Sequence, residues 1–418
     1  MSAYFMPSDI LLPDFDKVDA TAWSVIACDQ YTSQPEYWDQ VASLVGDRPS
    51  TLHLTLPEIY LAESADRVPL IHESMEQTLR EVLVRHKNSM IYLERTQSGG
   101  KVRRGLVGMI DLEDYDYRKG SASLIRATEA TVEERIPPRL AVRRDAALEL
   151  PHVMLLIDDR EYTVIEPLAA RAEKLEVAYS FSLMEKGGSV KGYFVDRAGI
   201  GRVANALSAL ISPEAIRERY GEGIAPLLFA VGDGNHSLAT AKAAYEEIKA
   251  AHGEDALLHP ARYALCEVVN LHDSALSFEP IHRVVFGVDP DAFLSALEAY
   301  SFSLHGGAEA QQARFVTASR RGTIHFSHPS EQLAVGTVQT FIDGYLAEHP
   351  EASVDYIHGT HAVESLVAKE GAVGLLLPTM GKEQLFKTVI ADGALPRKTF
   401  SMGHAADKRY YLECRRIR

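Results

Sequence analysis

The stretch Leu227–Lys242, L-L-F-A-V-G-D-G-N-H-S-L-A-T-A-K, decides how this chain is expected to fold. Its apolar run 227–231 predicts a buried strand, and residues 238–249 predict a helix. Gly232 and Gly234 between them predict a tight turn. Such a turn brings backbone N–H groups and the positive end of a helix dipole to one point, which favours binding of a phosphate.

Asp233 and His236 add a candidate metal ligand and a candidate acid or base to this turn. An ordinary turn remains the alternative, because Asp, Asn and Ser are common turn and cap residues. The chain has no G-x-x-x-x-G-K-S/T sequence, and Ser237 stands where a G-x-G-x-x-G sequence has its third glycine. H-E-x-x-H, C-x-x-C and G-x-S-x-G are also absent. The absence of these motifs argues against P-loop NTPases, Rossmann dehydrogenases, and the commonest zinc proteases, redox proteins and serine hydrolases.

The composition is that of a globular protein with a large core. Of the 418 residues 46% are hydrophobic and 24% are charged, which suffices for two or three structural units. The net charge of -15 opposes binding to nucleic acid or to anionic membranes, because both need a basic face. We therefore expect a small-molecule substrate as the partner, and the formation of a homo-oligomer stays open.

Cysteine content and the N-terminus predict the compartment. Cys28, Cys266 and Cys414 are odd in number and far apart, so neither a disulfide framework nor a structural zinc site is expected. Residues 1–13 lack an apolar signal segment, and no apolar run reaches the roughly 18 residues of a membrane span. The expectation is a cytoplasmic protein that is neither exported nor embedded in a membrane.

The order of the expected elements predicts an α+β fold (mixed α/β). Expected strands are residues 23–27, 90–94, 105–111, 152–157, 163–166, 227–231 and 263–269, and expected helices begin near residues 35, 65, 200, 213 and 238. The composition becomes simpler beyond about residue 287. We therefore expect a core over residues 1–287 that carries the glycine turn, and a smaller mixed unit over residues 288–418, separate or packed on the core.

Polar side chains follow the first expected strand. They are Asp29, Gln30, Thr32 and Ser33. Open sheets place ligands at the ends of their strands, so this string is a candidate binding segment. Asp29 is the first candidate for a general base.

Basic residues gather in the stretch 126–144, after the strand at 263–269, and in the loop 395–409. The candidates there are Arg126, Arg139, His282, Arg283 and Lys398. Guanidinium groups suit bidentate recognition of phosphate or carboxylate. The alternatives are a solvated helix face, a core histidine and a charged hairpin turn, and the sequence leaves them open.

Five segments together resemble the DUF1015 family of uncharacterised proteins over essentially the whole chain. They are W-S-V-I-A-C-D-Q-Y-T-S from residue 23, I-R-A-T-E-A-T from 125, F-A-V-G-D-G-N-H-S-L-A-T-A-K from 229, F-E-P-I-H-R-V from 278 and L-P-R-K-T-F-S from 395. That family is grouped with the ParB and sulfiredoxin-like superfamily, so the resemblance implies such a core with additional helices. The glycine turn is similar to the D-G-H-H-R turn of free serine kinases of the SerK type. Asn235 replaces the first histidine and Ser237 the arginine, so a cation is expected from Arg126, Arg139 or Lys398.

The resemblance implies phosphoryl transfer between a nucleotide, ATP or ADP, and a small hydroxyl compound such as L-serine, assisted by Mg²⁺. Asp29, Asp233 and His236 would then be catalytic, with Asp233 holding the Mg²⁺. The residues expected to bind phosphate or substrate are Gln30, Thr32, Ser33, Arg126, Thr128, Glu129, Arg139, Gly232, Gly234, Asn235, Ser237, His282, Arg283 and Lys398. A phosphatase acting on O-phosphoserine, and a non-catalytic protein that binds a nucleotide or metabolite, remain alternatives.

Overall fold

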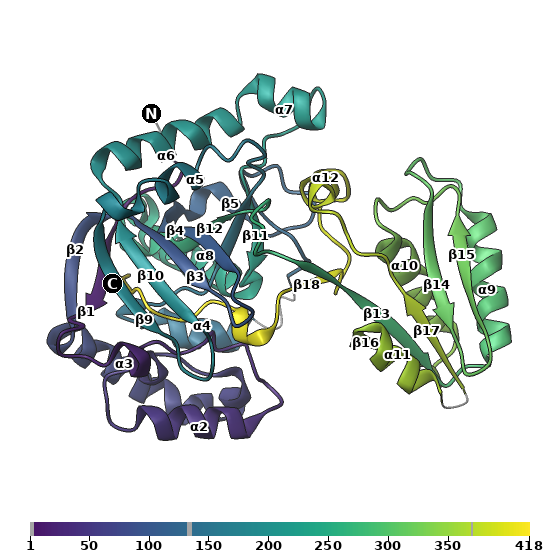
Figure 1. Cartoon of the computed structure of the whole chain (residues 1–418), viewed down its shortest axis with the longest axis horizontal. Helices are drawn as coiled ribbons and strands as arrows, with labels where there is room; N and C mark the ends of the chain where they lie inside the picture. Colours follow the sequence, from purple (N-terminus) through teal and green to yellow (C-terminus); the bar gives the residue numbers. More distant parts are fainter. Residues whose placement is uncertain (1–3, 132–135, 369–370) are drawn as a thin grey trace. The chain divides into compact units, whose positions relative to one another are not determined.

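The structure, a computed structural model, describes residues 4–131, 136–368 and 371–418 (Figure 1). Part of the basic stretch 126–144, residues 132–135, thus lies outside the described residues. The chain forms two compact units. Unit 1 comprises residues 1–127, 131–276 and 404–418, and unit 2 comprises residues 128–130 and 277–403.

These units divide the chain differently from the expected ranges of 1–287 and 288–418. Strand β13 (Phe278–Phe286) falls in unit 2, where it pairs with strands on both sides. The C-terminal segment returns to unit 1, where the Tyr411 N–H donates to the carbonyl of Val25 at 2.8 Å. Both differences arise from pairing between segments far apart in the chain, which local composition does not report.

The main sheet of unit 1 is mixed. Its strands, in order across the sheet, are β5 (Tyr115–Asp116), β6 (Ile125–Ala127), β11 (Phe229–Asp233), β8 (Met154–Ile157), β12 (Tyr263–Asn270), β4 (Val102–Asp111), β3 (Ile91–Thr96), β10 (Ser189–Phe194) and β9 (Glu176–Ser182). Strand β8 is antiparallel to β11 and parallel to β12. The glycine turn after β11 therefore lies beside the start of β8, whereas the end of β8 lies beside the end of β12. Short sheets pair β1 (Ser8–Pro13) with β2 (Leu83–Ser89), and β7 (Leu148–Glu149) with β19 (Arg415–Arg416).

Helices cover both faces of this sheet. They are α1 (Ala20–Trp23), α2 (Pro35–Val45), α3 (Ser64–Glu81), α4 (Ile136–Arg144), α5 (Glu166–Ala169), α6 (Arg197–Leu210), α7 (Pro213–Tyr220) and α8 (Asn235–His252). Successive residues of a strand point to opposite faces. Tyr92 of β3 accordingly joins the core formed with α6 and α8, while its neighbours Ile91 and Leu93 join the core formed with α2. In Figure 1, α6 is drawn above the sheet and α2 below it.

Several predicted elements are confirmed. Residues 91–94 and 105–111 lie in β3 and β4, which pair antiparallel. The predicted strand, turn and helix around the two glycines are β11 and α8. Helix α7 begins at Pro213, and the Ser212 hydroxyl caps it by accepting from the Ala215 N–H. Strong local signals of periodicity and capping thus predicted these elements.

Two predicted strands are wrong. Residues 23–27 contain the end of α1, which Asp19 caps, and Ile26 forms only an isolated bridge to Tyr410. Residues 163–165 form a bend that leads into α5 at Glu166, because the Asp159 carboxylate accepts from the N–H groups of Thr163 and Val164. In the second place an aspartate satisfies backbone N–H groups that a strand would pair with a neighbour.

Unit 2 contains its own antiparallel sheet. The strands, in order, are β15 (Arg321–Phe326), β14 (Gln311–Val316), β17 (Ala372–Leu376), β13 and β16 (Ser353–His358), with β18 (Phe400–Met402) pairing at the start of β13. Its helices are α9 (Pro290–Ser303), α10 (Ala334–Glu348), α11 (Thr360–Val367) and α12 (Lys382–Asp392). Val284 of β13 and Val363 of α11 lie together in its core. The mixed α/β fold class expected from the sequence is confirmed in the two units.

Candidate functional site

The glycine turn of unit 1 packs directly on the start of β8. Gly234 has a φ of 79°, and it precedes α8 as its N-cap. A Cβ atom at this position would lie 3.1 Å from the Val153 Cα and 3.4 Å from the His152 Cδ2. The close approach and the positive φ together require glycine here. The turn therefore fixes the N-terminus of α8 against His152.

His152 is the centre of a polar cluster in unit 1. Its Nε2 lies 3.3 Å from the Ser237 Oγ and 3.6 Å from an Asp29 carboxylate oxygen. Its Nδ1 lies 2.9 Å from the hydroxyl of Tyr411, which itself donates to the Cys28 Sγ at 3.0 Å. His152 thus brings Ser237, Asp29 and Tyr411 together around one ring.

Asp29 is ionised in this setting. Burial would raise the pKa of Asp29, but the charge of His152, a hydrogen bond from Gln30 at 2.9 Å and the charge of Lys408 outweigh burial and lower it. A carboxyl group that is already ionised at neutral pH is ready to accept a proton. Asp29 thus has the protonation state that the sequence interpretation as a general base requires.

Lys408 supplies a cation beside the glycine turn. Its Nζ lies 3.1 Å from one carboxylate oxygen of Asp233, and the other oxygen accepts from the Gly234 N–H at 2.9 Å. The side-chain Oδ1 of Asn235 is buried and finds no hydrogen-bond partner among the described residues. An acceptor left in this state costs free energy unless a ligand or water satisfies it. The turn thus combines a positive charge with an acceptor available to a ligand.

A cavity of about 160 Å³ opens beside this cluster, entirely within unit 1. Cys28, His152, Ser237 and Tyr411 contribute to one part of its wall. Arg139 of α4 also lines it and forms an ion pair with Glu58 of the 3₁₀ helix Glu58–Glu63. We term the residues Asp29, His152, Ser237, Asp233 and Lys408 the polar cluster, and it adjoins this cavity.

Other predicted residues of unit 1 lie elsewhere or serve the fold. Arg126 is buried and donates to the backbone carbonyls of Ser123, Ala225 and Pro226. Thr32 and Ser33 are exposed on the turn before α2. His236 is the second residue of α8 and is half-buried, and Gly232 is the penultimate residue of β11, next to Asp233.

The predicted residues that belong to unit 2 are Thr128, Glu129, His282, Arg283 and Lys398. Arg283 is fully buried and donates to the carbonyls of Ile281, Arg397 and Lys398. The His282 Nδ1 accepts from the Leu377 N–H at 3.2 Å. The carbonyl of Thr128 accepts from the Leu395 N–H at 2.6 Å, and Glu129 forms a bridge to the same residue. These contacts hold the backbone of unit 2 together.

The sequence interpretation missed His152, Tyr411 and the role of Lys408. Lys408 stands in the basic loop 395–409, so that loop was the right signal, although Lys398 was chosen from it. His152 immediately precedes an apolar strand, and Tyr411 lies near the C-terminus. Because their partners are more than 80 residues away in sequence, no local spacing links them.

The expected role of Asp233 as a magnesium ligand stays a prediction. Both carboxylate oxygens of Asp233 are engaged, and among the described ranges no group of three or more His, Cys, Asp or Glu side chains could hold a metal ion. Magnesium in phosphoryl-transfer enzymes is usually held by one or two carboxylates together with the substrate phosphates. The chemistry proposed below is therefore described for the side chains and backbone of the chain alone. Separately, every helix in the described ranges is too short or too polar to cross a membrane.

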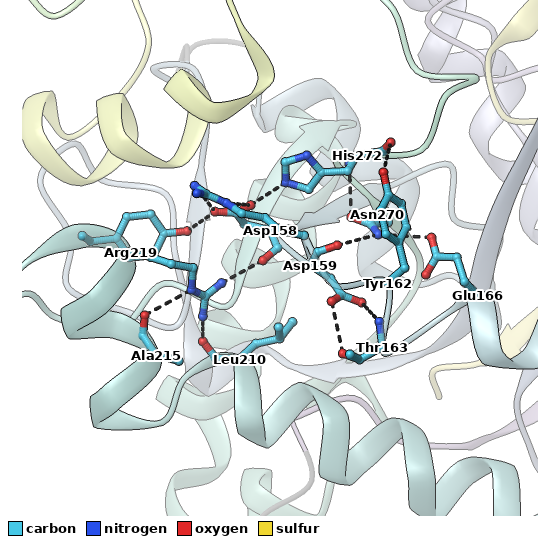
Figure 2. Close-up of polar contacts among 12 residues, drawn as sticks. Asp158, Asp159, Tyr162, Thr163, Glu166, Leu210, Ala215, Arg219, Asn270 and His272 are labelled. Atoms are coloured by element: carbon cyan, nitrogen blue, oxygen red, sulfur yellow. Dashed lines mark hydrogen bonds and ion pairs between the residues drawn. The ribbon is translucent and has the colours of Figure 1, made fainter.

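A second polar network lies at the other end of β8 (Figure 2). Asp158 accepts from the Tyr220 hydroxyl at 2.6 Å, and the His272 Nε2 lies 2.6 Å from its other oxygen. Burial would raise the pKa of Asp158, but these hydrogen bonds and those from Arg160 hold it well below its usual range. The Asp158 carbonyl also accepts from Arg219. This network ties the end of β8 to α7 and to the end of β12, and its polar groups serve the fold.

The fold and the polar cluster define a mixed α/β protein with a glycine turn that leads from a sheet into a helix. The chain belongs to the DUF1015 family, described as a protein of unknown function, whose profile matches residues 13–354. No curated protein matches the chain. The resemblance to DUF1015 expected from the sequence is thus confirmed.

Solved structures similar to the chain are distant. A conserved hypothetical protein from Pyrococcus furiosus matches with 10% identity and a TM-score of 0.36, over 75% of this chain and 95% of that chain. A mutant free serine kinase in complex with AMP matches with 9% identity and a TM-score of 0.38, over 75% and 92%. SbnI with a C-terminal truncation from Staphylococcus aureus matches with 10% identity and a TM-score of 0.34, over 71% and 82%.

Proposed function

We propose that this protein transfers a phosphoryl group from a nucleotide, ATP or ADP, to a small compound that carries a hydroxyl group. The observation that carries the proposal is the meeting of Asp29, His152 and Ser237 at the N-terminus of α8. Phosphoryl transfer depends mainly on charge neutralisation and positioning. Asp29, as a proton acceptor beside a helix N-terminus that has no side-chain cap, supports both charge neutralisation and positioning.

The phosphate groups bind at the start of α8 in this proposal. Because the N-cap residue is Gly234, no N-cap side chain accepts from the first N–H groups of the helix. Those groups, the helix dipole and the charge of Lys408 favour an anion. The N–H groups of Asn235, His236 and Ser237 are the donors that we assign to the phosphate. Lys408 replaces the cation that the sequence interpretation sought from Arg126, Arg139 or Lys398.

Asp29 acts on the acceptor. Its carboxylate takes the proton of the acceptor hydroxyl as that oxygen forms a bond to phosphorus. The bond from phosphorus to the bridging oxygen of the nucleotide breaks, and its electron pair leaves with the shortened nucleotide. His152 stands within reach of both Asp29 and Ser237, and the hydroxyl of Tyr411 fixes the orientation of its ring. His152 is thus a positioning residue for Asp29.

The test is phosphorus NMR of the full chain with Mg²⁺, ATP or ADP, and L-serine as the first acceptor. A new phosphomonoester signal that depends on both nucleotide and acceptor is the expected result. A parallel sample contains O-phosphoserine without nucleotide, and release of inorganic phosphate there would favour a phosphatase instead. Nucleotide binding without any product would replace the proposal by a non-catalytic binding protein.

A further inference from the structure

The cavity beside the polar cluster has the size and lining of a site for a hydrocarbon group. Its volume is about 160 Å³. Buried or half-buried apolar side chains form most of the wall, among them Leu56, Met75, Val142, Leu148, Leu238 and Ala241. Apolar cavities of about 150 Å³ stay dry and bind benzene. The cavity therefore matches a group between benzene and indole in size.

Several polar side chains that reach this cavity are already engaged by other groups, although the Arg143 Nε is buried without a hydrogen-bond partner among the described residues. Arg139 pairs with Glu58, and Arg143 pairs with Glu149. The Thr240 hydroxyl donates to a carbonyl of its own helix. Against the apolar part of the wall, a purine or a zwitterionic amino acid would lose hydrogen bonds to water and find few partners there, whereas a hydrocarbon ring would lose none. The lining thus selects a hydrocarbon ring over a nucleobase or free serine.

One part of the wall connects the cavity to the polar cluster. His152 and Ser237 line the cavity, and the same His152 Nε2 that faces Ser237 lies 3.6 Å from Asp29. A ring in the cavity would carry a short hydroxyl-bearing arm toward these three side chains. Small-molecule sites commonly combine such an apolar cavity with a few polar groups that fix orientation.

We propose that the acceptor of the phosphoryl group is an alcohol with a hydrocarbon ring, and that the cavity binds the ring while Asp29 and His152 receive the hydroxyl. This inference rests on the proposed function and names its substrate class. The acceptor forms a new bond from its oxygen to phosphorus and gives its proton to Asp29, and the nucleotide leaves with the electron pair of the broken bond. L-serine is then a poor acceptor because it has no ring to fill the cavity.

Binding of benzyl alcohol to the full chain, followed by NMR titration, tests the cavity without requiring turnover. Ala146 lines the cavity and its neighbour Ala147 does not, although each is 4% exposed and both lie in the same core cluster. Filling the cavity in Ala146→Leu should weaken binding by about tenfold or more, whereas Ala147→Leu should leave it unchanged. Equal binding by wild type and Ala146→Leu would overturn the inference.

A second matched pair covers the case in which Ala147→Leu fails to fold. Ala241 of α8 lines the cavity and Ala244 of the same helix does not. Loss of benzyl alcohol binding in Ala241→Leu but not in Ala244→Leu supports the inference, and the reverse pattern overturns it. Each variant is first shown to be folded by circular dichroism.

Two further experiments, competition with AMP and assay of phosphoryl transfer, distinguish a nucleobase from an acceptor ring in the cavity and test the two proposals separately. If AMP displaces benzyl alcohol, the cavity holds the nucleobase and the acceptor class is wrong. If benzyl alcohol binds without competing with AMP, and no phosphoryl transfer to any acceptor occurs, the proposed function fails while the cavity site stands. If L-serine is phosphorylated and benzyl alcohol does not bind, the proposed function stands and the substrate class fails.

Discussion

Replacing Gly234 by alanine should destabilise unit 1 at the candidate site. A side chain at its φ of 79° costs about 1–2 kcal/mol, because L-residues are strained in the left-handed region. The new Cβ would also lie 3.1 Å from the Val153 Cα, a backbone atom that moves only with the start of β8. This overpacking adds about 1–3 kcal/mol. We expect the free energy of unfolding to fall by about 2–5 kcal/mol in total.

Gly223 provides the matched control. Its φ of 73° is similar, but a Cβ there meets nothing within 4 Å. Gly223→Ala should therefore lose only the backbone cost of about 1–2 kcal/mol. Urea unfolding of both variants, followed by circular dichroism, measures the difference. Equal losses in the two variants would refute the argument that the turn is packed against β8.

Three other variants test the cluster and the second network. His152→Ala should lower the rate of phosphoryl transfer by about 100-fold, because Asp29 loses its positioning partner, and an unchanged rate at saturating substrates would count against that role. Lys408→Met should weaken nucleotide binding by about tenfold or more in calorimetric titration. The control Lys249→Met, at the far end of α8, should leave nucleotide binding unchanged. Equal nucleotide affinities of the two variants would show that Lys408 does not bind the nucleotide. Asp158→Asn should cost about 3 kcal/mol of stability at pH 7, because it removes the charge of a buried carboxylate that pairs with Arg160 and accepts from Tyr220. The pKa of Asp158 is lowered in the folded state, so its contribution is present above the unfolded value of about 3.9 and disappears as the pH falls through the folded value. Unfolding curves of wild type and variant should therefore converge in acid, and a gap that stays constant down to pH 2 would contradict this assignment.

The parts of the fold that sequence predicted are those with a local cause. The strand, turn and helix around Gly234 follow from an apolar run, two glycines and a periodic segment, and α7 follows from the Ser212 cap. The strand expected at 23–27 failed because its pairing partner is the segment around Tyr411, almost 400 residues later. Pairing at that separation leaves no local trace in the sequence.

The residues of the candidate site, like the elements of the fold, could be predicted only where a local feature of the sequence marks them. Ser237 and the turn residues were found because they stand at the end of a strand or the start of a helix, whereas Asp29 was chosen at the end of an expected strand that does not form. His152 joins them only because β8 runs antiparallel to β11, which brings its first residues to the glycine turn. Conversely, Arg126 and Arg283 look like anion binders in the sequence but are buried donors to backbone carbonyls. Side-chain type alone does not separate these two uses of arginine.

The measurement that tests the central claim most directly is the rate of phosphoryl transfer in Asp29→Asn, followed by phosphorus NMR with ATP or ADP. L-serine and benzyl alcohol serve as acceptors, and Asp39→Asn on the exposed face of α2 is the control. We predict product formation by wild type, a loss of about 100-fold or more in Asp29→Asn, and an unchanged rate in the control. A wild-type rate in Asp29→Asn would contradict the role of Asp29, and wild-type protein that forms no phosphorylated product with either acceptor would contradict the proposed activity.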